Sequence, residues 1–203
     1  MSKHILLDRD GVINRRILNG YVTSWQQFEF LPQVLDALRL LTESGYRVIV
    51  VSNQAGVGKG LMSSETLADI TAHFVEEVER NGGRVERVYY CPHRDHDGCE
   101  CRKPKPGLLL QAQREHLFAF ADTFLVGDSQ RDLMAARHVG CPAILVGGGE
   151  VNVDAKEWPS EPEAILPDLY AATRFILARK RPGRKYPLQE TPSAPLPFPN
   201  STS

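Results

Sequence analysis

The sequence predicts an α/β fold of three layers, in which a parallel sheet lies between two layers of helices. Short apolar runs alternate with longer amphipathic stretches along most of the chain. This β-α-β-α order is typical of parallel sheets, because two parallel strands must be joined by a crossover, which is usually a helix. In addition, acidic, hydroxyl and basic side chains follow several of the apolar runs. Ligands bind beyond the carboxyl ends of the strands in such folds, so these polar side chains are candidates for a functional site.

Five apolar runs are predicted to be buried strands. They are residues 5–7, 48–51, 85–90, 124–126 and 143–146. The stretches between them predict helices, because their apolar residues fall on one face at helical spacing. The first such face consists of Leu31, Val34, Leu35, Leu38 and Leu41, and the second consists of Leu67, Ile70, Phe74, Val75 and Val78. We expect shorter helices at residues 105–116 and 130–139 and a loop at residues 147–165. A last helix is predicted from about Pro167 to Lys180, with Pro167 near its first position.

The chain has 203 residues, enough for one domain with a substantial core, and we expect this domain to span residues 1–180. The proline-rich residues 181–203 are expected to form a disordered tail. The formal net charge of −1 argues against a general electrostatic attraction to nucleic acid or to an acidic membrane. No apolar run approaches the roughly 20 residues of a membrane span, and the start lacks the pattern of a signal peptide. We therefore expect a cytoplasmic protein, and a monomer.

Of the four cysteines, Cys141 stands apart and is predicted to be a small core residue.

The segment Asp8-Arg9-Asp10-Gly11 directly follows the first predicted strand. Two carboxylates two residues apart can serve one reaction in two roles, because one attacks or holds a metal while the other transfers a proton. We predict that Asp8 is a nucleophile toward phosphorus, and that Asp10 protonates the leaving alcohol and then deprotonates water. Gly11 permits the sharp turn that exposes both carboxylates. This segment alone could be a surface turn, but three further polar segments follow in order, at residues 52–54, 102–104 and 127–132.

An anionic nucleophile that approaches an anionic phosphate needs a cation nearby, and Mg²⁺ suits oxygen ligands and phosphate. We predict that Mg²⁺ is held by Asp8, by Asp10 through its backbone carbonyl, and by Asp128. Asp132 lies one helical turn beyond Asp128. Two roles remain open for Asp132, namely orienting the metal ligands or capping the helix.

Candidate phosphate-binding residues follow the second strand and the cysteine-rich loop. Ser52 can donate its hydroxyl and backbone amide to phosphate, and Asn53 can hold Asp10 or the substrate. The structural alternative for this pair is a helix-entry turn. Lys103 supplies a positive charge for the phosphoryl oxygens, while the fork of Arg102 can bind a second anionic group. An isolated Arg-Lys pair is usually solvated, but prolines and cysteines around this pair constrain it.

A zinc site is predicted at Cys91, His93, Cys99 and Cys101. Three thiolates and one imidazole fit a closed tetrahedral Zn²⁺ site, which is structural because no ligand position is left open. It would brace the loop that presents residues 102 and 103. His96 is an alternative ligand to His93. Two other interpretations are three reduced cysteines beside a surface histidine, and a zinc ribbon that binds nucleic acid, which would require a basic surface.

The ordered segments resemble the motifs of the haloacid dehalogenase superfamily of phosphotransferases over about residues 4–146. The resemblance implies a Rossmann-like fold, and a capless one, because no long insertion separates the motifs. It also implies Asp8 as the nucleophile, Asp10 as the acid and base, and Asp128 as a Mg²⁺ ligand. Ser52 and Lys103 are implied to bind phosphate. Aspartate at both position 8 and position 10 suits the hydrolysis of phosphate esters.

The run Cys-Pro-His…Cys-x-Cys-Arg-Lys-Pro is similar to one subfamily that has two main activities. One removes the 7-phosphate of a heptose 1,7-bisphosphate in nucleotide-activated heptose and lipopolysaccharide biosynthesis, and the segments at residues 14–32 and 52–57 favour it. The other hydrolyses histidinol phosphate and remains the alternative. The expected partner is thus a phosphorylated sugar, whose hydroxyls require hydrogen-bonding groups. Candidate substrate-binding residues are Asn19, Gly20, Tyr21, Ser52, Asn53, Gln54, Arg102 and Lys103. A non-catalytic, zinc-braced binding module is a third interpretation.

Overall fold

The computed structural model describes residues 3–147 and 161–179. Within them, the strands are β1 (Lys3–Leu7), β2 (Tyr46–Asn53), β3 (Val85–Cys91), β4 (Phe124–Gly127), β5 (Ala143–Val146) and β6 (Ala164–Leu166). They form one six-stranded sheet in the order β3-β2-β1-β4-β5-β6, and every neighbouring pair is parallel. All five predicted strands are confirmed, with ends that differ by at most two residues. The tail predicted at residues 181–203 lies outside the described residues.

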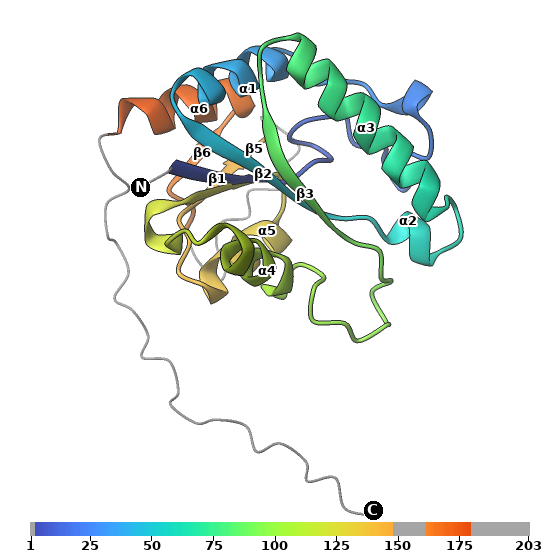
Figure 1. Ribbon diagram of the computed structural model, residues 1–203. Helices are drawn as coiled ribbons and strands as arrows, with labels where there is room; N and C mark the ends of the chain where they lie inside the picture. Colours follow the sequence, from blue (N-terminus) through green and yellow to red (C-terminus); the bar gives the residue numbers. More distant parts are fainter. Residues whose placement is uncertain (1–2, 148–160, 180–203) are drawn as a thin grey trace, which may run out of the picture.

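The described residues also form six α-helices and two short 3-10 helices. The α-helices are α1 (Val34–Glu43), α2 (Ala55–Gly58), α3 (Ser64–Arg80), α4 (Gly107–His116), α5 (Gln130–His138) and α6 (Leu169–Ala178), and the 3-10 helices are η1 (Trp25–Gln27) and η2 (Phe120–Asp122). Helices α1, α3 and α6 cover one face of the sheet, and α4 and α5 cover the other (Figure 1). The predicted three-layer α/β/α architecture is therefore confirmed.

The strands at the centre of the sheet bury both of their faces. In β1, Ile5 and Leu7 belong to the apolar cluster on the side of α1, α3 and α6, whereas Leu6 belongs to the cluster around α4 and α5. Alternate residues of a strand point to opposite faces, so a strand covered on both sides has to be apolar throughout. This explains why the sequence shows continuous apolar runs here. Cys141 is buried in the second cluster, as predicted.

The region before the last helix differs from the prediction in two respects. Residues 164–166 were expected to be part of a loop, but they form β6, which pairs with β5 from Ile144 opposite Ala164 to Val146 opposite Leu166. A three-residue strand at the sheet edge has too short an apolar run to be recognised by periodicity. The last helix begins at Leu169 rather than at Pro167, because the Asp168 side chain caps it by accepting from the Ala171 amide at 2.7 Å. Residues 148–160 of the loop predicted at residues 147–165 lie outside the described residues.

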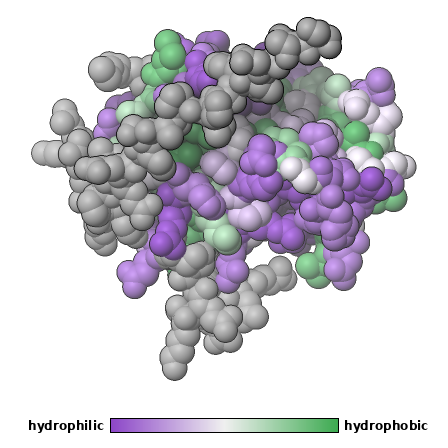
Figure 2. All heavy atoms as spheres, turned by 90° about the horizontal axis from the view of Figure 1, so that it is seen from below, coloured by the Kyte–Doolittle hydropathy of each residue, from purple (hydrophilic) through white to green (hydrophobic). Residues whose placement is uncertain are grey.

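The surface on the side of α4 and α5 is predominantly hydrophilic. Figure 2 shows the molecule from below, with polar side chains over most of the coloured atoms and apolar ones in small, separate areas. Among the residues that the structure describes, no helix is both long and apolar enough to cross a membrane.

Phe74 anchors helix α3 in the apolar core, and its packing yields a stability prediction. Phe74 is fully buried, and its ring lies 5.7 Å from that of Phe28. Replacing Phe74 with alanine should lower the free energy of unfolding by about 3–5 kcal/mol, because a cavity remains where the ring was. Urea denaturation measures this change. Leu117→Ala is the control, since Leu117 is 84% exposed and its loss should change stability little. Equal effects of the two substitutions would contradict the packing described here.

Candidate active site

The carboxyl ends of β1, β2 and β4 lie together because these strands are neighbours in the sheet. Asp8 directly follows β1, Ser52 and Asn53 end β2, and Asp128 directly follows β4. The chain leaves β1 toward β2 on one side and later returns to form β4 on the other side. A crevice is expected at such a point of reversal. The sheet thus brings these predicted residues to one edge, as the sequence indicated.

Three carboxylates meet at this edge. Asp8, Asp128 and Asp132 each place an oxygen within 4.8 Å of the others. Two glycines make this approach possible. A Cβ on Gly11, whose φ is +89°, would lie 2.1 Å from Asp128 Oδ2, and a Cβ on Gly127 would lie 2.3 Å from Asp132 Cβ. Any other residue at either position would displace a carboxylate of the cluster.

Lys103 neutralises part of this negative charge. Its side chain is 2% exposed, and its Nζ lies 3.0 Å from Asp8 Oδ1 and 2.5 Å from Asp132 Oδ1. The same Nζ donates to the Val51 carbonyl at 2.8 Å. The other carboxylate oxygen of Asp132 accepts from the Ser129 backbone N–H at 3.2 Å, which is a capping-box contact at the start of α5, and from the Ser129 hydroxyl at 2.6 Å. Of the two roles left open for Asp132, capping is therefore present, and the same side chain also binds Lys103.

The acidic cluster changes the proton affinities of its members. Burial raises the pKa of Asp8 to about 6; Lys103 opposes this shift, and the negative charges of Asp132 and Asp10 add to it. Burial likewise raises the pKa of Asp128 to about 7, with further contributions from Asp8 and Asp132. Burial lowers the pKa of Lys103, but Asp132 and Asp8 outweigh this effect and raise it overall. Burial thus disfavours the charged form of both carboxyls, and a cation bound between them would favour it.

Asn53 fixes the backbone of Lys103. Its amide nitrogen donates to the Lys103 carbonyl at 2.9 Å, and its amide oxygen accepts from the Lys103 N–H at 3.0 Å. The sequence had suggested that Asn53 holds Asp10 or the substrate. Instead, this side chain joins the end of β2 to the loop that carries Lys103. Asp10 is contacted by the following residue, Gln54.

The Asp10 carboxylate is bound by three donors and lies outside the acidic cluster of Asp8, Asp128 and Asp132. Oδ1 accepts from Asn14 Nδ2 at 2.9 Å and from Arg9 Nη2 at 3.0 Å. Oδ2 accepts from Gln54 Nε2 at 2.5 Å and from the same Arg9 nitrogen at 3.1 Å. The sequence prediction did not assign functions to Arg9 and Asn14. The available signal was a charged residue between two aspartates, directly after a buried strand.

Ser52 and Arg102 also lie near this edge, each with a partner. Ser52 is buried at the end of β2, and its hydroxyl accepts from Gln54 Nε2 at 3.3 Å. Arg102 donates from Nε to Asp95 Oδ1 at 2.8 Å and from Nη1 to the His93 carbonyl at 3.4 Å. The orientation of Arg102 is therefore set by the loop that follows β3.

The predicted substrate loop at residues 19–21 is only partly connected to this region. Asn19 and Gly20 are exposed, and Asn19 has a positive φ of 54°. Tyr21 packs against α2, since a Cβ on Gly56 would lie 3.1 Å from the Tyr21 ring. Lys59 Nζ lies 5.2 Å from the centre of the same ring. The structure thus ties Tyr21 to the helix that follows Gln54.

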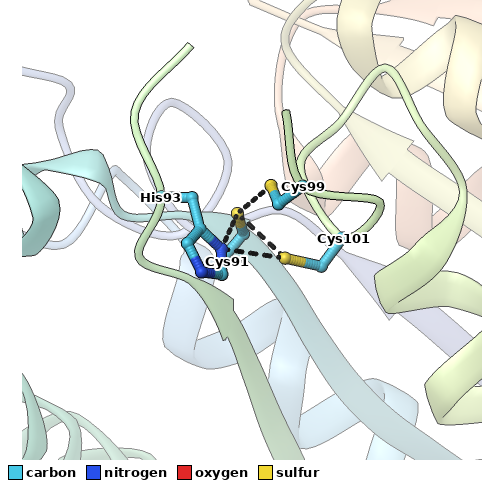
Figure 3. Close-up of side chains that lie close together, drawn as sticks. All are labelled: Cys91, His93, Cys99 and Cys101. Atoms are coloured by element: carbon cyan, nitrogen blue, oxygen red, sulfur yellow. Dashed lines mark hydrogen bonds between the residues drawn. The ribbon is translucent and has the colours of Figure 1, made fainter. Parts of the chain in front are cut away.

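The predicted zinc ligands form a second cluster after β3. Cys91, His93, Cys99 and Cys101 each place a ligand atom within 4.8 Å of the others, and all cysteines are free thiols. Figure 3 shows the four side chains pointing toward one another. The Cys91 sulfur lies 3.7 Å from that of Cys99 and 3.2 Å from that of Cys101, while His93 Nδ1 lies 3.3 Å from the Cys101 sulfur. This donor set fits a closed, four-coordinate metal site in which His93, rather than His96, is the imidazole.

Backbone contacts join this loop to the acidic edge. The backbone N–H of Gln54 donates to the Cys91 carbonyl at 2.7 Å, and the backbone N–H of Gly58 donates to the Pro92 carbonyl at 3.0 Å. The Gly107 amide donates to the Glu100 carbonyl at 3.1 Å and connects the loop to the start of α4. The cysteine cluster is therefore in a position to fix the segment that carries residues 102 and 103.

A doubly covered parallel sheet with an aspartate pair after β1, a lysine from a later loop and an acidic residue after β4 defines a hydrolase of the haloacid dehalogenase type. In agreement, residues 100–172 match a family model described as HAD-hydrolase-like.

Comparison with known proteins narrows this class. The chain is 38% identical over 179 residues to the D-glycero-beta-D-manno-heptose-1,7-bisphosphate 7-phosphatase of Pseudomonas aeruginosa, an alignment that covers 87% of this chain and 99% of that one. It is 39% identical over 150 residues to the D-glycero-alpha-D-manno-heptose-1,7-bisphosphate 7-phosphatase of Mycobacterium bovis, covering 71% of this chain and 79% of that one. A solved structure of the D,D-heptose 1,7-bisphosphate phosphatase from B. bronchiseptica, complexed with magnesium and phosphate, is 36% identical with a TM-score of 0.81, covering 86% of this chain and 98% of that one. The chain belongs to the family of heptose-1,7-bisphosphate 7-phosphatases.

The raised pKa values in the acidic cluster predict how stability depends on pH. In the folded protein without added Mg²⁺, Asp8 titrates at about 6 and Asp128 at about 7, against 3.8 in the unfolded chain. The folded state then binds these protons more tightly than the unfolded state. Their contribution to stability is therefore greatest below about pH 4 and declines as the pH rises toward 7.

Replacing Asp128 with asparagine should remove part of this decline, so the free energy of unfolding of the variant should fall less between pH 5 and pH 8. Urea denaturation of both proteins across this range, without added Mg²⁺, measures the difference. An Asp36→Asn control should have the slope of the unmodified protein, because Asp36 lies on the exposed face of α1. An equal dependence of the free energy of unfolding on pH in all three proteins would contradict the link between the raised pKa of Asp128 and stability.

Proposed function

We propose that this chain hydrolyses the 7-phosphate of D-glycero-D-manno-heptose 1,7-bisphosphate, as an enzyme of nucleotide-activated heptose biosynthesis. The observation that carries the proposal is the identity of 35–38% to the named Pseudomonas phosphatases over 99% of their length. The acidic cluster with its buried lysine supports the same reaction class. Histidinol phosphate, the alternative substrate suggested by the sequence, is not favoured by these relatives.

In the proposed mechanism Asp8 attacks the phosphorus atom. The Arg9 amide at 2.7 Å and Lys103 Nζ at 3.0 Å both contact Asp8 Oδ1, which leaves Oδ2 as the attacking oxygen. The bond from phosphorus to the sugar oxygen breaks, and Asp10 gives its proton to that oxygen. Asp10 then takes a proton from water, whose oxygen attacks phosphorus and releases Asp8. Lys103 and Ser52 bind the phosphoryl oxygens, and Arg102 binds the second phosphate or a sugar hydroxyl.

The proposed enzyme also binds two metal ions, Mg²⁺ in the acidic cluster and Zn²⁺ in the cysteine cluster. Asp8, the Asp10 carbonyl and Asp128 would hold Mg²⁺, since Asp8 and Asp128 place carboxylate oxygens within 4.8 Å of each other. Mg²⁺ supplies charge that offsets the repulsion between carboxylate and phosphate. The four side chains of the cysteine cluster would hold Zn²⁺ in a structural role. Burial and the neighbouring thiols raise the pKa of Cys91, so forming a thiolate there calls for a cation.

The proposed site needs one chain and a reducing environment. All its residues come from a single chain, so a monomer suffices for the reaction. The zinc-binding cysteines must remain reduced, which fits the cytoplasm.

The nucleophile is tested by Asp8→Asn. This substitution should lower kcat for heptose 1,7-bisphosphate by about 10⁴-fold or more, because an amide cannot form the phosphoenzyme. Phosphate release with Mg²⁺ is measured for both anomers of the sugar and for histidinol phosphate. Asp36→Asn is the control and should retain full activity. Preserved activity in Asp8→Asn would refute the mechanism, and a preference for histidinol phosphate would refute the proposed substrate.

The zinc site is tested through metal content and stability. The purified protein should contain one zinc per chain, and Cys101→Ala should lose it and unfold at a lower temperature, because the loop at residues 91–104 is then released. Atomic emission and thermal denaturation measure the two effects. Cys141→Ala removes a buried thiol outside the cluster, so this control should retain the zinc. A protein that keeps its full stability without zinc would rule out the bracing role.

A further inference from the structure

The two aspartates at the end of β1 have separate cationic partners. Lys103 contacts Asp8, whereas Arg9 contacts Asp10. The Arg9 side chain is 1% exposed, while that of Asp10 is 24% exposed and therefore reachable from solvent. A buried guanidinium beneath a partly accessible carboxylate is an arrangement suited to holding that carboxylate in place.

The surroundings of Arg9 satisfy only part of the hydrogen-bonding capacity of its guanidinium. Its guanidinium lies over two aromatic rings, 5.8 Å from the centre of Phe28 and 5.6 Å from the centre of Tyr90. Among the described residues, its Nε and Nη1 atoms find no hydrogen-bond partner. Burying polar groups without partners is costly, and an apolar side chain would fill this space without that cost. The guanidinium makes its hydrogen bonds to Asp10 through Nη2, the atom that contacts both carboxylate oxygens.

The donors around Asp10 hold its carboxylate from both sides. A carboxylate offers about four lone-pair positions. Three nitrogen atoms make four hydrogen bonds to them, because Nη2 of Arg9 contacts both oxygens, while Nδ2 of Asn14 and Nε2 of Gln54 contact one oxygen each. The orientation of the carboxylate is therefore fixed on both oxygens.

We propose that Arg9, together with Asn14 and Gln54, is a positioning residue that holds the Asp10 carboxylate in line with the leaving oxygen and the attacking water. This inference rests on the proposed function and deepens it. In the first step the proton passes from Asp10 to the sugar oxygen as the P–O bond breaks. In the second step Asp10 takes a proton from water as the bond from phosphorus to Asp8 breaks. Neither proton transfer is efficient if the carboxylate rotates, because the donor and acceptor must lie within hydrogen-bond reach.

The test compares substrates that differ in their need for a proton. p-Nitrophenolate leaves without protonation, whereas a sugar alkoxide does not. In Arg9→Met, kcat for heptose 1,7-bisphosphate should fall by about 10²-fold or more, with KM within about threefold of its original value. With p-nitrophenyl phosphate, the same variant should release a rapid burst of about one p-nitrophenolate per enzyme. Steady-state turnover should then be slow, because hydrolysis of the phosphoenzyme still needs Asp10 as base.

Further variants separate positioning from folding. Gln54→Met keeps the side-chain length and removes one donor to Asp10, so it should show the same pattern with a smaller loss. Arg9→Lys restores one charged donor and should recover part of the activity lost in Arg9→Met. Arg39→Met, on the exposed face of α1, is the matched control and should leave both substrates unaffected. Thermal denaturation of each variant shows whether it is folded.

The outcomes distinguish this inference from the proposed function. If Asp8→Asn is inactive but folded Arg9→Met and Gln54→Met show unchanged kcat, the positioning role is refuted and the phosphatase mechanism stands. In Arg9→Met and Gln54→Met, the burst with p-nitrophenyl phosphate and the kcat for heptose bisphosphate could also fall by the same factor. In that case Arg9 acts on the fold of the whole site, and the inference is again refuted. If Asp8→Asn remains active, the mechanism itself fails.

Discussion

The buried ammonium of Lys103 is the interaction on which the rest of the site depends. It lies between Asp8 after β1 and Asp132 in α5, and it also binds the Val51 carbonyl in β2. One charge thereby links two neighbouring strands and a helix. Without it, burial and mutual repulsion would drive protons onto the carboxylates, as the raised pKa values of Asp8 and Asp128 already show. A lysine removed from water at this position is tolerated because two carboxylates and a carbonyl accept hydrogen bonds from its ammonium group.

Lys103 does not belong to the sheet, so its position has to be secured from outside. Asn53 binds both polar backbone groups of Lys103, and the cysteine cluster gathers the chain just before it. The loop is thus attached at two points, by an amide at the end of β2 and by the thiols that follow β3. In this fold a residue on a strand end, such as Asp8, is placed by the sheet itself. A residue on a long connection needs fixation of its own, and this explains why a small chain carries a second cluster of polar side chains.

The strands, the layers and the meeting of Asp8, Ser52, Lys103 and Asp128 at one edge were predictable from the sequence, because buried strands are continuous apolar runs and parallel strands align their carboxyl ends. The four side chains of the cysteine cluster were predictable from spacing alone. Side-chain partners were not. Asn53 and Gln54 are adjacent amides, and only the backbone direction at the end of β2 decides that the first binds Lys103 and the second binds Asp10. Strand β6 was missed because its pairing with β5, rather than its three residues, makes it a strand.

The five residues between His93 and Cys99 are all exposed, and Gly98 has open space around it with a φ of +66°. Asp95 in this segment binds Arg102. However, Arg102 and Lys103 directly follow Cys101 in the chain, so the cysteine cluster holds them closer than the outer part of the loop does. Residues added between His96 and Gly98 would therefore lengthen the loop outward, as exposed loop tips generally allow, without moving the lysine. The loop thus offers a place where new contacts to larger substrates can evolve or be engineered while the reacting groups keep their arrangement.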